Sequence, residues 1–141
     1  MTDAGGSPFS AEQIKHLEFI QAVITRLGNG SFLIKGWALT LLAAFLGFSL
    51  RDLDWKLSAV ALVPLVGFWL LDSYFLRQER LFRKLYDQAR LPGKVEVFSM
   101  NVGPYVREVS WFAVVRSSTM AGFYGTLTVV TLILVVVALL K

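Results

Sequence analysis

Residues 117–140 read SSTMAGFYGTLTVVTLILVVVALL and contain no charged side chain. An α-helix rises about 1.5 Å per residue, so this stretch is long enough to cross the ~30 Å hydrocarbon core of a bilayer. Two further apolar stretches have a similar length, residues 31–50 (SFLIKGWALTLLAAFLGFSL) and residues 57–76 (LSAVALVPLVGFWLLDSYFL). Their only charged residues are Lys35 and Asp72. The pattern predicts three transmembrane helices, a hairpin followed by a C-terminal span.

The overall composition points the same way. Of 141 residues, 55% are hydrophobic and 17% are charged, and the mean hydropathy is +0.60. Soluble domains carry roughly a quarter charged residues, so this chain has too few polar side chains to cover a soluble fold of its size. It contains no cysteine, which excludes disulfides, thiolate metal sites and cysteine nucleophiles. We therefore expect an all-α membrane protein with amphipathic cytoplasmic helices rather than a soluble enzyme.

The N-terminal region is expected to form a helix of its own before the first span. Residues 1–9 are rich in glycine and polar residues and are predicted to be disordered. Residues 10–28 form an amphipathic pattern that opens with a capping box at Ser10 and Gln13. The Gly-Asn-Gly sequence at residues 28–30 is expected to end this helix before the span begins.

The rest of the chain connects the spans. Residues 51–56 are predicted to form an outer turn, and the second span is expected to kink at Pro64 and to continue as a cytoplasmic helix to residue 90. Residues 91–116 are interpreted as a cytoplasmic loop that ends in an interfacial helix. Within this loop, the alternation at residues 94–100 (KVEVFSM) predicts a short strand.

Basic residues are distributed unevenly between the two sides of the predicted spans. Eleven lysines and arginines lie on the side of the N-terminus and of residues 77–116, and three lie on the other side. By the positive-inside rule, the N-terminus and this long segment face the cytoplasm, and the C-terminus faces outward. We expect a multi-pass protein of the bacterial cytoplasmic (inner) membrane that contacts anionic lipid headgroups. Specific nucleic-acid binding is not expected, because no recognition motif accompanies the charge.

Lys35 and Asp72 are equally far along the chain from the middle of the turn at residues 51–56. In an antiparallel hairpin they therefore lie at the same depth, near the inner leaflet. Ionisable groups in hydrocarbon are costly unless they are paired or hydrated. One interpretation is a structural ion pair, and the other is a pair that faces a cavity or pore and gates it.

The third span carries small residues at the spacing typical of close helix packing. Ser117, Ala121 and Gly125 form one row, and Ser118 and Gly122 form a second. Such rows allow two helices to approach closely inside a membrane. They can serve packing within the chain or association between copies of it, and the sequence leaves both interpretations open.

The predicted helix beyond the second span has a mixed surface. Arg80, Arg83 and Lys84 alternate with the apolar residues Leu81 and Leu85. This set is a candidate surface for a cytoplasmic partner or for lipid. Its apolar stripe is alternatively expected to pack against the stripe of the N-terminal helix.

Recognisable catalytic motifs are absent from the sequence. It contains no glycine-rich phosphate loop, no dinucleotide fingerprint and no cluster of metal-ligand residues. The only histidine, His16, is expected to be a surface residue. We therefore predict no catalytic, cofactor-binding or metal-binding residues and no enzymatic activity.

The segments LEFIQAVITRLGNGSFLIKGWALTL (residues 17–41) and FWLLDSYFLRQERLFRKLYD (residues 68–87) resemble an uncharacterised family of small bacterial integral membrane proteins. The order of N-terminal helix, two-span hairpin and charged helix is loosely similar to the SLATT class of membrane effectors in bacterial conflict systems. That resemblance implies a homo-oligomeric pore or membrane-disrupting effector in phage defence, triggered by a cytoplasmic activating partner. The alternative is a structural or regulatory membrane subunit that binds a cytoplasmic or membrane partner, and a small transporter is a third hypothesis.

Overall fold

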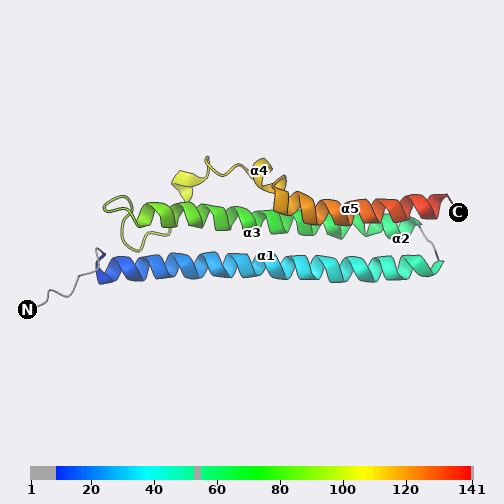
Figure 1. Ribbon diagram of the computed structural model, residues 1–141, viewed down its shortest axis with the longest axis horizontal. Helices are drawn as coiled ribbons and strands as arrows, with labels where there is room; N and C mark the ends of the chain where they lie inside the picture. Colours follow the sequence, from blue (N-terminus) through cyan, green and yellow to red (C-terminus); the bar gives the residue numbers. More distant parts are fainter. Residues whose placement is uncertain (1–8, 53–54, 141) are drawn as a thin grey trace, which may run out of the picture.

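The computed structural model describes residues 9–52 and 55–140, and all its regular elements are helical (Figure 1). In chain order they are α1 (Ala11–Asp52), α2 (Trp55–Val60), α3 (Leu62–Ala89), a 3-10 turn (Gly103–Tyr105), α4 (Trp111–Val115) and α5 (Ser118–Leu139). α1 runs along α2 and α3, and α5 packs against α2 and α3 (Figure 1). Within the described residues, three helical stretches are long and apolar enough to cross a membrane, which confirms the all-α prediction. Residues 1–8, which belong to the segment predicted to be disordered, lie outside the described residues. Residues 53–54, in the middle of the predicted outer turn, also lie outside them.

α1 is a single helix of 42 residues. At about 1.5 Å per residue it is roughly 63 Å long, about twice the thickness of a hydrocarbon core. It begins at the predicted capping box, where the Ser10 amide donates to Gln13 Oε1 over 2.9 Å and the Gln13 amide donates to Ser10 Oγ over 3.2 Å. The apolar stretch at residues 31–50 covers about half of this helix, so α1 is about twice as long as a membrane crossing requires.

The expected break of α1 at residues 28–30 is wrong, because the helix continues through them. Gly30 serves close packing instead, since a Cβ placed there would lie 2.7 Å from Phe75 Cε1 on α3. A Cβ at Gly28 would lie 3.6 Å from a carboxylate oxygen of Glu79, which is an ordinary contact. Glycine in a helix costs about 1 kcal/mol relative to alanine, but here it lets α1 and α3 approach closely.

The second apolar stretch is interrupted once, at Ala61 between α2 and α3. Pro64 lacks the N–H that would bond the Val60 carbonyl, and its ring crowds that carbonyl. These two effects of proline account for the interruption of the helix at Ala61. α3 then continues without a break beyond the apolar stretch to Ala89. Gly93, with a φ of 69°, turns the chain back after the helix.

Beyond α3 the structure differs from the expected strand and interfacial helix. Residues 94–100 form turns rather than a strand, because within the described residues no other strand is available for pairing. The segment instead lies over α1, where the Ser99 carbonyl accepts a hydrogen bond of 2.9 Å from His16 Nε2. The prediction that His16 lies on the surface is therefore wrong, since its residue is only 3% exposed. The interfacial helix is short and covers only Trp111–Val115.

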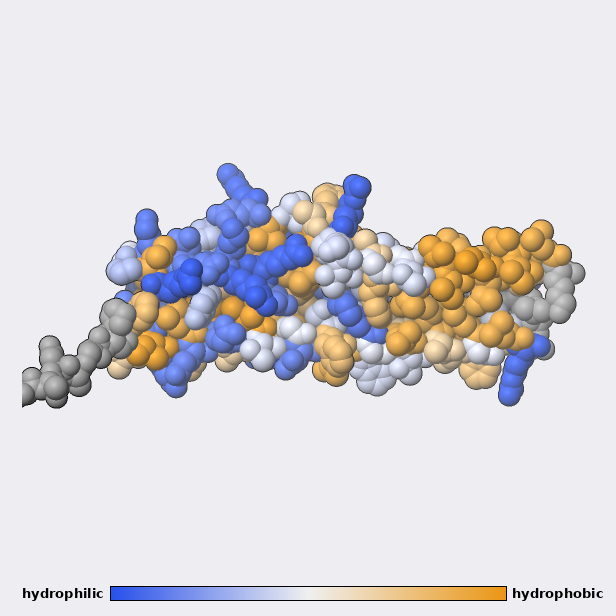
Figure 2. Space-filling model, in the orientation of Figure 1, coloured by the Kyte–Doolittle hydropathy of each residue, from blue (hydrophilic) through white to orange (hydrophobic). Residues whose placement is uncertain are grey.

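The bundle has two chemically different halves (Figure 2). We call residues 11–30, 77–89 and 90–116 the polar half, and residues 31–52, 55–76 and 118–139 the apolar half. In the polar half the two predicted stripes pack together, with Ile20 and Ile24 of α1 against Leu85 of α3. Loop residues cover this core, so the polar half is a small helical body with its own packed interior.

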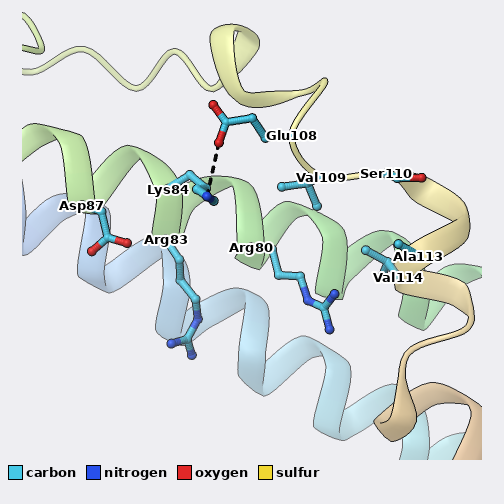
Figure 3. Close-up of a pocket in the computed structure, with 9 residues that line it drawn as sticks. All are labelled: Arg80, Arg83, Lys84, Asp87, Glu108, Val109, Ser110, Ala113 and Val114. Carbon is cyan, nitrogen blue, oxygen red and sulfur yellow. Dashed lines mark ion pairs between the residues drawn. The ribbon is translucent and has the colours of Figure 1, made fainter.

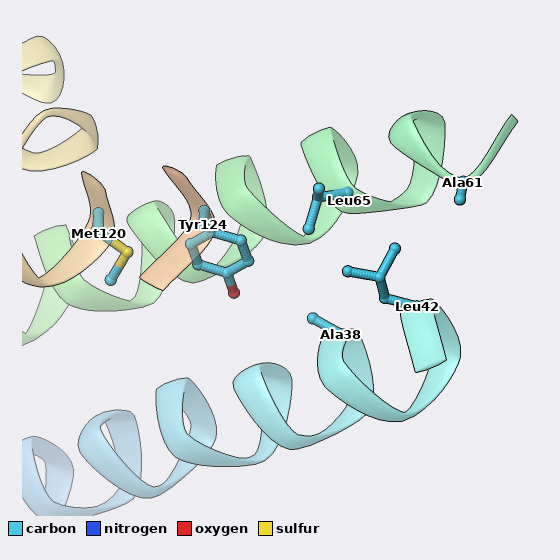
Figure 4. Packing of buried hydrophobic residues seen from close by; sticks show 6 residues of the cluster. All are labelled: Ala38, Leu42, Ala61, Leu65, Met120 and Tyr124. Atoms are coloured by element: carbon cyan, nitrogen blue, oxygen red, sulfur yellow. The ribbon is translucent and has the colours of Figure 1, made fainter. Parts of the chain in front are cut away.

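The core of the apolar half brings together all three candidate spans (Figure 4). It consists of Ala38, Leu42, Ala61, Leu65, Met120 and Tyr124. Outside this core, large apolar side chains face outward, and Phe32, Trp37 and Val63 are each more than 60% exposed. An apolar surface this extensive is typical of contact with lipid or another protein rather than with water.

Candidate functional site

The most buried charge in the described residues is the Asp72 carboxylate on α3, which is 0% exposed. Its Oδ2 lies 2.5 Å from Lys35 Nζ and accepts a hydrogen bond of 3.0 Å from the Tyr124 hydroxyl. Its Oδ1 accepts a hydrogen bond from the Ser31 hydroxyl. Lys35 Nζ also donates to Ser31 Oγ over 2.9 Å, so the four side chains form a closed network. We call Ser31, Lys35, Asp72 and Tyr124 the Asp72 cluster.

Helix geometry explains why these residues meet. Ser31 and Lys35 are four residues apart on α1 and therefore share one face. Asp72 lies on the opposing face of α3 at the same level, as the equal distances from the outer turn predicted. Tyr124 reaches the carboxylate from α5. The Asp72 cluster thus joins α1, α3 and α5 at a single point.

A second set of contacts holds Tyr124 in place. The Trp69 ring stacks on the Tyr124 ring with centroids 5.8 Å apart and planes inclined by 9°. The Trp69 indole N–H donates to the Val115 carbonyl over 3.1 Å, which ties α3 to the end of α4. Ser73 Oγ donates to the Trp69 carbonyl over 2.7 Å. These contacts fix the phenol beside the carboxylate.

The sequence interpretation identified Lys35 and Asp72 but missed Ser31 and Tyr124. A signal for Ser31 was present, because a hydroxyl one helical turn from a lysine can share its partner. No equivalent signal existed for Tyr124, since its position depends on how α5 packs against the hairpin.

A second polar contact lies near the other end of the apolar half. Ser49 Oγ and Ser58 Oγ are 2.5 Å apart, and both residues are buried. A hydroxyl inside an apolar bundle is costly unless it is hydrogen-bonded, and this pair joins α1 to α2. The hairpin is therefore fixed by polar contacts close to both of its ends.

The interior of the apolar half is tightly packed between the Asp72 cluster and the outer turn. The gap next to Ala38, Leu42 and Leu65 has a water-accessible volume of about 0 Å³. The Asp72 side chain is completely buried, whereas the Lys35 side chain is 20% exposed. The carboxylate is therefore a joint between helices, and only the ammonium end of the pair reaches the surface.

The small residues of α5 lie mostly outside the core of the bundle. Ala121 and Gly122 are exposed, whereas Ser117 and Gly125 are only partly buried. A Cβ at Gly122 or at Gly125 would meet no atom within 4 Å. Packing inside this chain therefore does not require glycine at either position, and Met120, Tyr124 and Thr131 make the buried contacts of α5 instead.

The predicted partner surface of α3 is only partly a surface. Leu81 and Leu85 are each 1% exposed and belong to the interior of the polar half, so they are not available to a partner. Arg80, Arg83 and Lys84 remain accessible and line a pocket of about 340 Å³ beside the segment 108–114 (Figure 3).

Within the described residues, no group of three or more histidine, aspartate or glutamate side chains could hold a metal ion. Comparisons with protein-family models, curated proteins and solved structures found no match to this chain. The geometry of the Asp72 cluster and of the exposed faces is therefore the basis for a functional assignment.

Proposed function

We propose that this protein is a three-span protein of the bacterial inner membrane that assembles into a homo-oligomer and permeabilises the membrane as an effector in phage defence. The N-terminus and the polar half lie in the cytoplasm, and the C-terminus lies outside. The observation that carries the proposal is the exposed row of small residues on α5, which comprises Ser118, Gly122 and Thr126. This row has the spacing that allows close contact between membrane helices.

Within the described residues, the interior of one copy of the apolar half is tightly packed. The polar atoms of the Asp72 cluster are satisfied within the chain, and the gap next to Ala38, Leu42 and Leu65 admits no water. A conducting path therefore has to lie between copies. The partly exposed Lys35 side chain supports this arrangement, because a charge at the surface of the apolar half is favourable beside water or a partner and costly in lipid.

Gly122 is the position at which this proposal can be tested most cleanly. A side chain there enters open space in the single chain, so Gly122→Leu leaves the fold intact and blocks only a close approach from outside. Gly67 on α3 provides a matched control, since it is also exposed and also has no atom within 4 Å of a Cβ. Gly67 lies beside the large exposed residues Val63 and Leu70, so its face is not a small-residue row.

The experiment compares wild type, Gly122→Leu and Gly67→Leu for oligomer size in native-like lipid discs and for dye release from liposomes. The proposal expects wild type and Gly67→Leu to form oligomers and release dye, and Gly122→Leu to do both much less. A wild-type protein that is monomeric in lipid and leaves liposomes sealed contradicts it.

The alternative function is that of a structural or regulatory membrane subunit. It is supported by the polar half, where residues 11–30 of α1 extend about 30 Å and pack against α3 as a rigid body. Such a body is suited to receive a cytoplasmic partner. Monomeric protein with sealed liposomes is the result that favours this alternative over the pore.

A further inference from the structure

A pocket of about 340 Å³ lies between α3 and the segment 108–114 (Figure 3). Its floor is apolar and well packed, because Val109 and Val114 are buried against Leu81. Its polar wall carries three basic side chains from α3, those of Arg80, Arg83 and Lys84. The pocket thus combines a firm apolar base with a basic rim.

Two side chains of α3, those of Arg77 and Lys84, hold the loop side of this pocket against the helix. Arg77 donates one hydrogen bond of 3.0 Å to the Val109 carbonyl and another of 3.2 Å to the Val106 carbonyl. Lys84 Nζ lies 3.2 Å from a carboxylate oxygen of Glu108 (Figure 3). Because these contacts connect the two walls, the pocket is formed before any ligand arrives.

Two of the three basic side chains of the rim are already paired with carboxylates. Arg83 is paired with Glu79 at 2.7 Å, and Lys84 is paired with Glu108. The remaining carboxylate of the pocket, Asp87, lies at the opposite end from Arg80 (Figure 3). Within the described residues, Arg80 makes no hydrogen bond and no ion pair. Figure 3 shows its guanidinium extending away from α3.

We propose that this pocket binds a phosphate group through Arg80 and that the phosphate belongs to an anionic phospholipid. A guanidinium offers a planar set of five N–H donors that matches two oxygens of a phosphate at once. Its charge is not neutralised by a neighbouring carboxylate, so a phosphate supplies the missing counter-charge.

The height of Arg80 in the bundle identifies lipid as the source of the phosphate. Arg80 lies four residues beyond Leu76, the end of the apolar stretch, which is about 6 Å along the helix. The headgroup layer is about 5–7 Å thick on each side of the hydrocarbon core. Phe112, which precedes the pocket residue Ala113 in the sequence, is 76% exposed, so α4 also presents an exposed apolar ring.

The test uses the full chain in a neutral detergent and measures the thermal unfolding midpoint against added ligand. The ligands are a short-chain phosphatidylglycerol, the corresponding phosphatidylcholine and inorganic phosphate. The variants are Arg80→Gln, Arg80→Lys, and Arg26→Gln as a control that removes an exposed arginine outside this pocket. Circular dichroism verifies that each variant is folded, and Arg80→Lys keeps the test valid if Arg80→Gln does not fold.

The proposal expects phosphatidylglycerol to raise the midpoint of wild type and of Arg26→Gln much more than the other ligands do. Arg80→Gln should weaken this binding about tenfold or more, and Arg80→Lys should weaken it less, because it keeps the charge but loses the planar donors. Equal binding to Arg80→Gln and wild type overturns the site. Inorganic phosphate that binds as well as phosphatidylglycerol overturns the lipid source.

The lipid source rests on the membrane crossing in the proposed function, but the test is independent of the pore. A protein that is monomeric and leaves liposomes sealed can still bind phosphatidylglycerol through Arg80. Failure of one proposal is therefore distinguishable from failure of the other.

Discussion

Removing the Lys35 side chain is expected to destabilise the bundle more than removing the charge of its partner. Lys35→Met leaves the carboxylate of Asp72, which is 0% exposed, with only two neutral hydroxyl donors. Breaking a buried ion pair in this way costs about 3–5 kcal/mol. The Lys35 side chain is 20% exposed, so water already weakens the pair, and we expect about 3 kcal/mol.

Asp72→Asn should cost less, about 1–2 kcal/mol, because the amide oxygen still accepts a hydrogen bond from Tyr124. The freed Lys35 ammonium can turn toward the headgroup region, as long basic side chains do near the ends of membrane helices. In the double mutant neither charge remains. Its cost should stay near that of Asp72→Asn alone, which gives a coupling energy of about 3 kcal/mol in magnitude.

The measurement is reversible unfolding in mixed micelles with increasing sodium dodecyl sulfate. Far-ultraviolet circular dichroism reports helix loss, and the near-ultraviolet signal reports the stacked rings of Trp69 and Tyr124. Lys15→Met is the control, because the Lys15–Glu18 pair is more than half exposed and should contribute less than about 0.5 kcal/mol. Strictly additive losses in the double mutant would refute direct coupling between Lys35 and Asp72.

Three further substitutions test the packing of the long helices and of the loop that covers α1. Gly30→Ala should destabilise the bundle by about 1–3 kcal/mol, because its Cβ would meet the Phe75 ring at 2.7 Å. Gly36→Ala has open space around its Cβ and should stabilise α1 by up to about 1 kcal/mol. Unfolding in mixed micelles measures both effects, and equal effects would contradict the close approach of α1 and α3. His16→Leu should leave the Ser99 carbonyl without its hydrogen-bond donor and destabilise the loop by about 1–2 kcal/mol. Hydrogen exchange in residues 94–102 should then be faster. Unchanged exchange would show that this contact does not hold the loop.

The features of the fold that depend on local chemistry could be predicted from the sequence. Uninterrupted apolar length predicts the three long helices, and the capping box predicts where α1 begins. The equal distances of Lys35 and Asp72 from the outer turn predict their meeting, because an antiparallel hairpin converts sequence distance into depth. These predictions need only helix geometry and the cost of unpaired charge in an apolar environment.

The sequence predictions failed where the same residue type can occur in two different environments, and only contacts between distant parts of the chain decide between them. Gly28 and Gly30 have the composition of a helix end, but the bulk of Phe75 on α3 requires glycine at residue 30 within a continuous helix. His16 looked like a surface residue because its partner, the Ser99 carbonyl, lies 83 residues away in the chain. Arg80, Arg83 and Lys84 are accessible, but the burial of Leu81 could not be predicted, because it depends on how the loop returns to α3.

The central claim is that α1, the α2–α3 pair and α5 each cross the membrane once. Because the chain contains no cysteine, single cysteines at Thr2, Lys94 and Lys141 can report the side of the membrane without background. A membrane-impermeant maleimide applied to intact cells or spheroplasts should label Lys141→Cys, and should label Thr2→Cys and Lys94→Cys only after lysis. Labelling of Lys94→Cys and Lys141→Cys from the same side would contradict the three-span arrangement and, with it, the proposed pore.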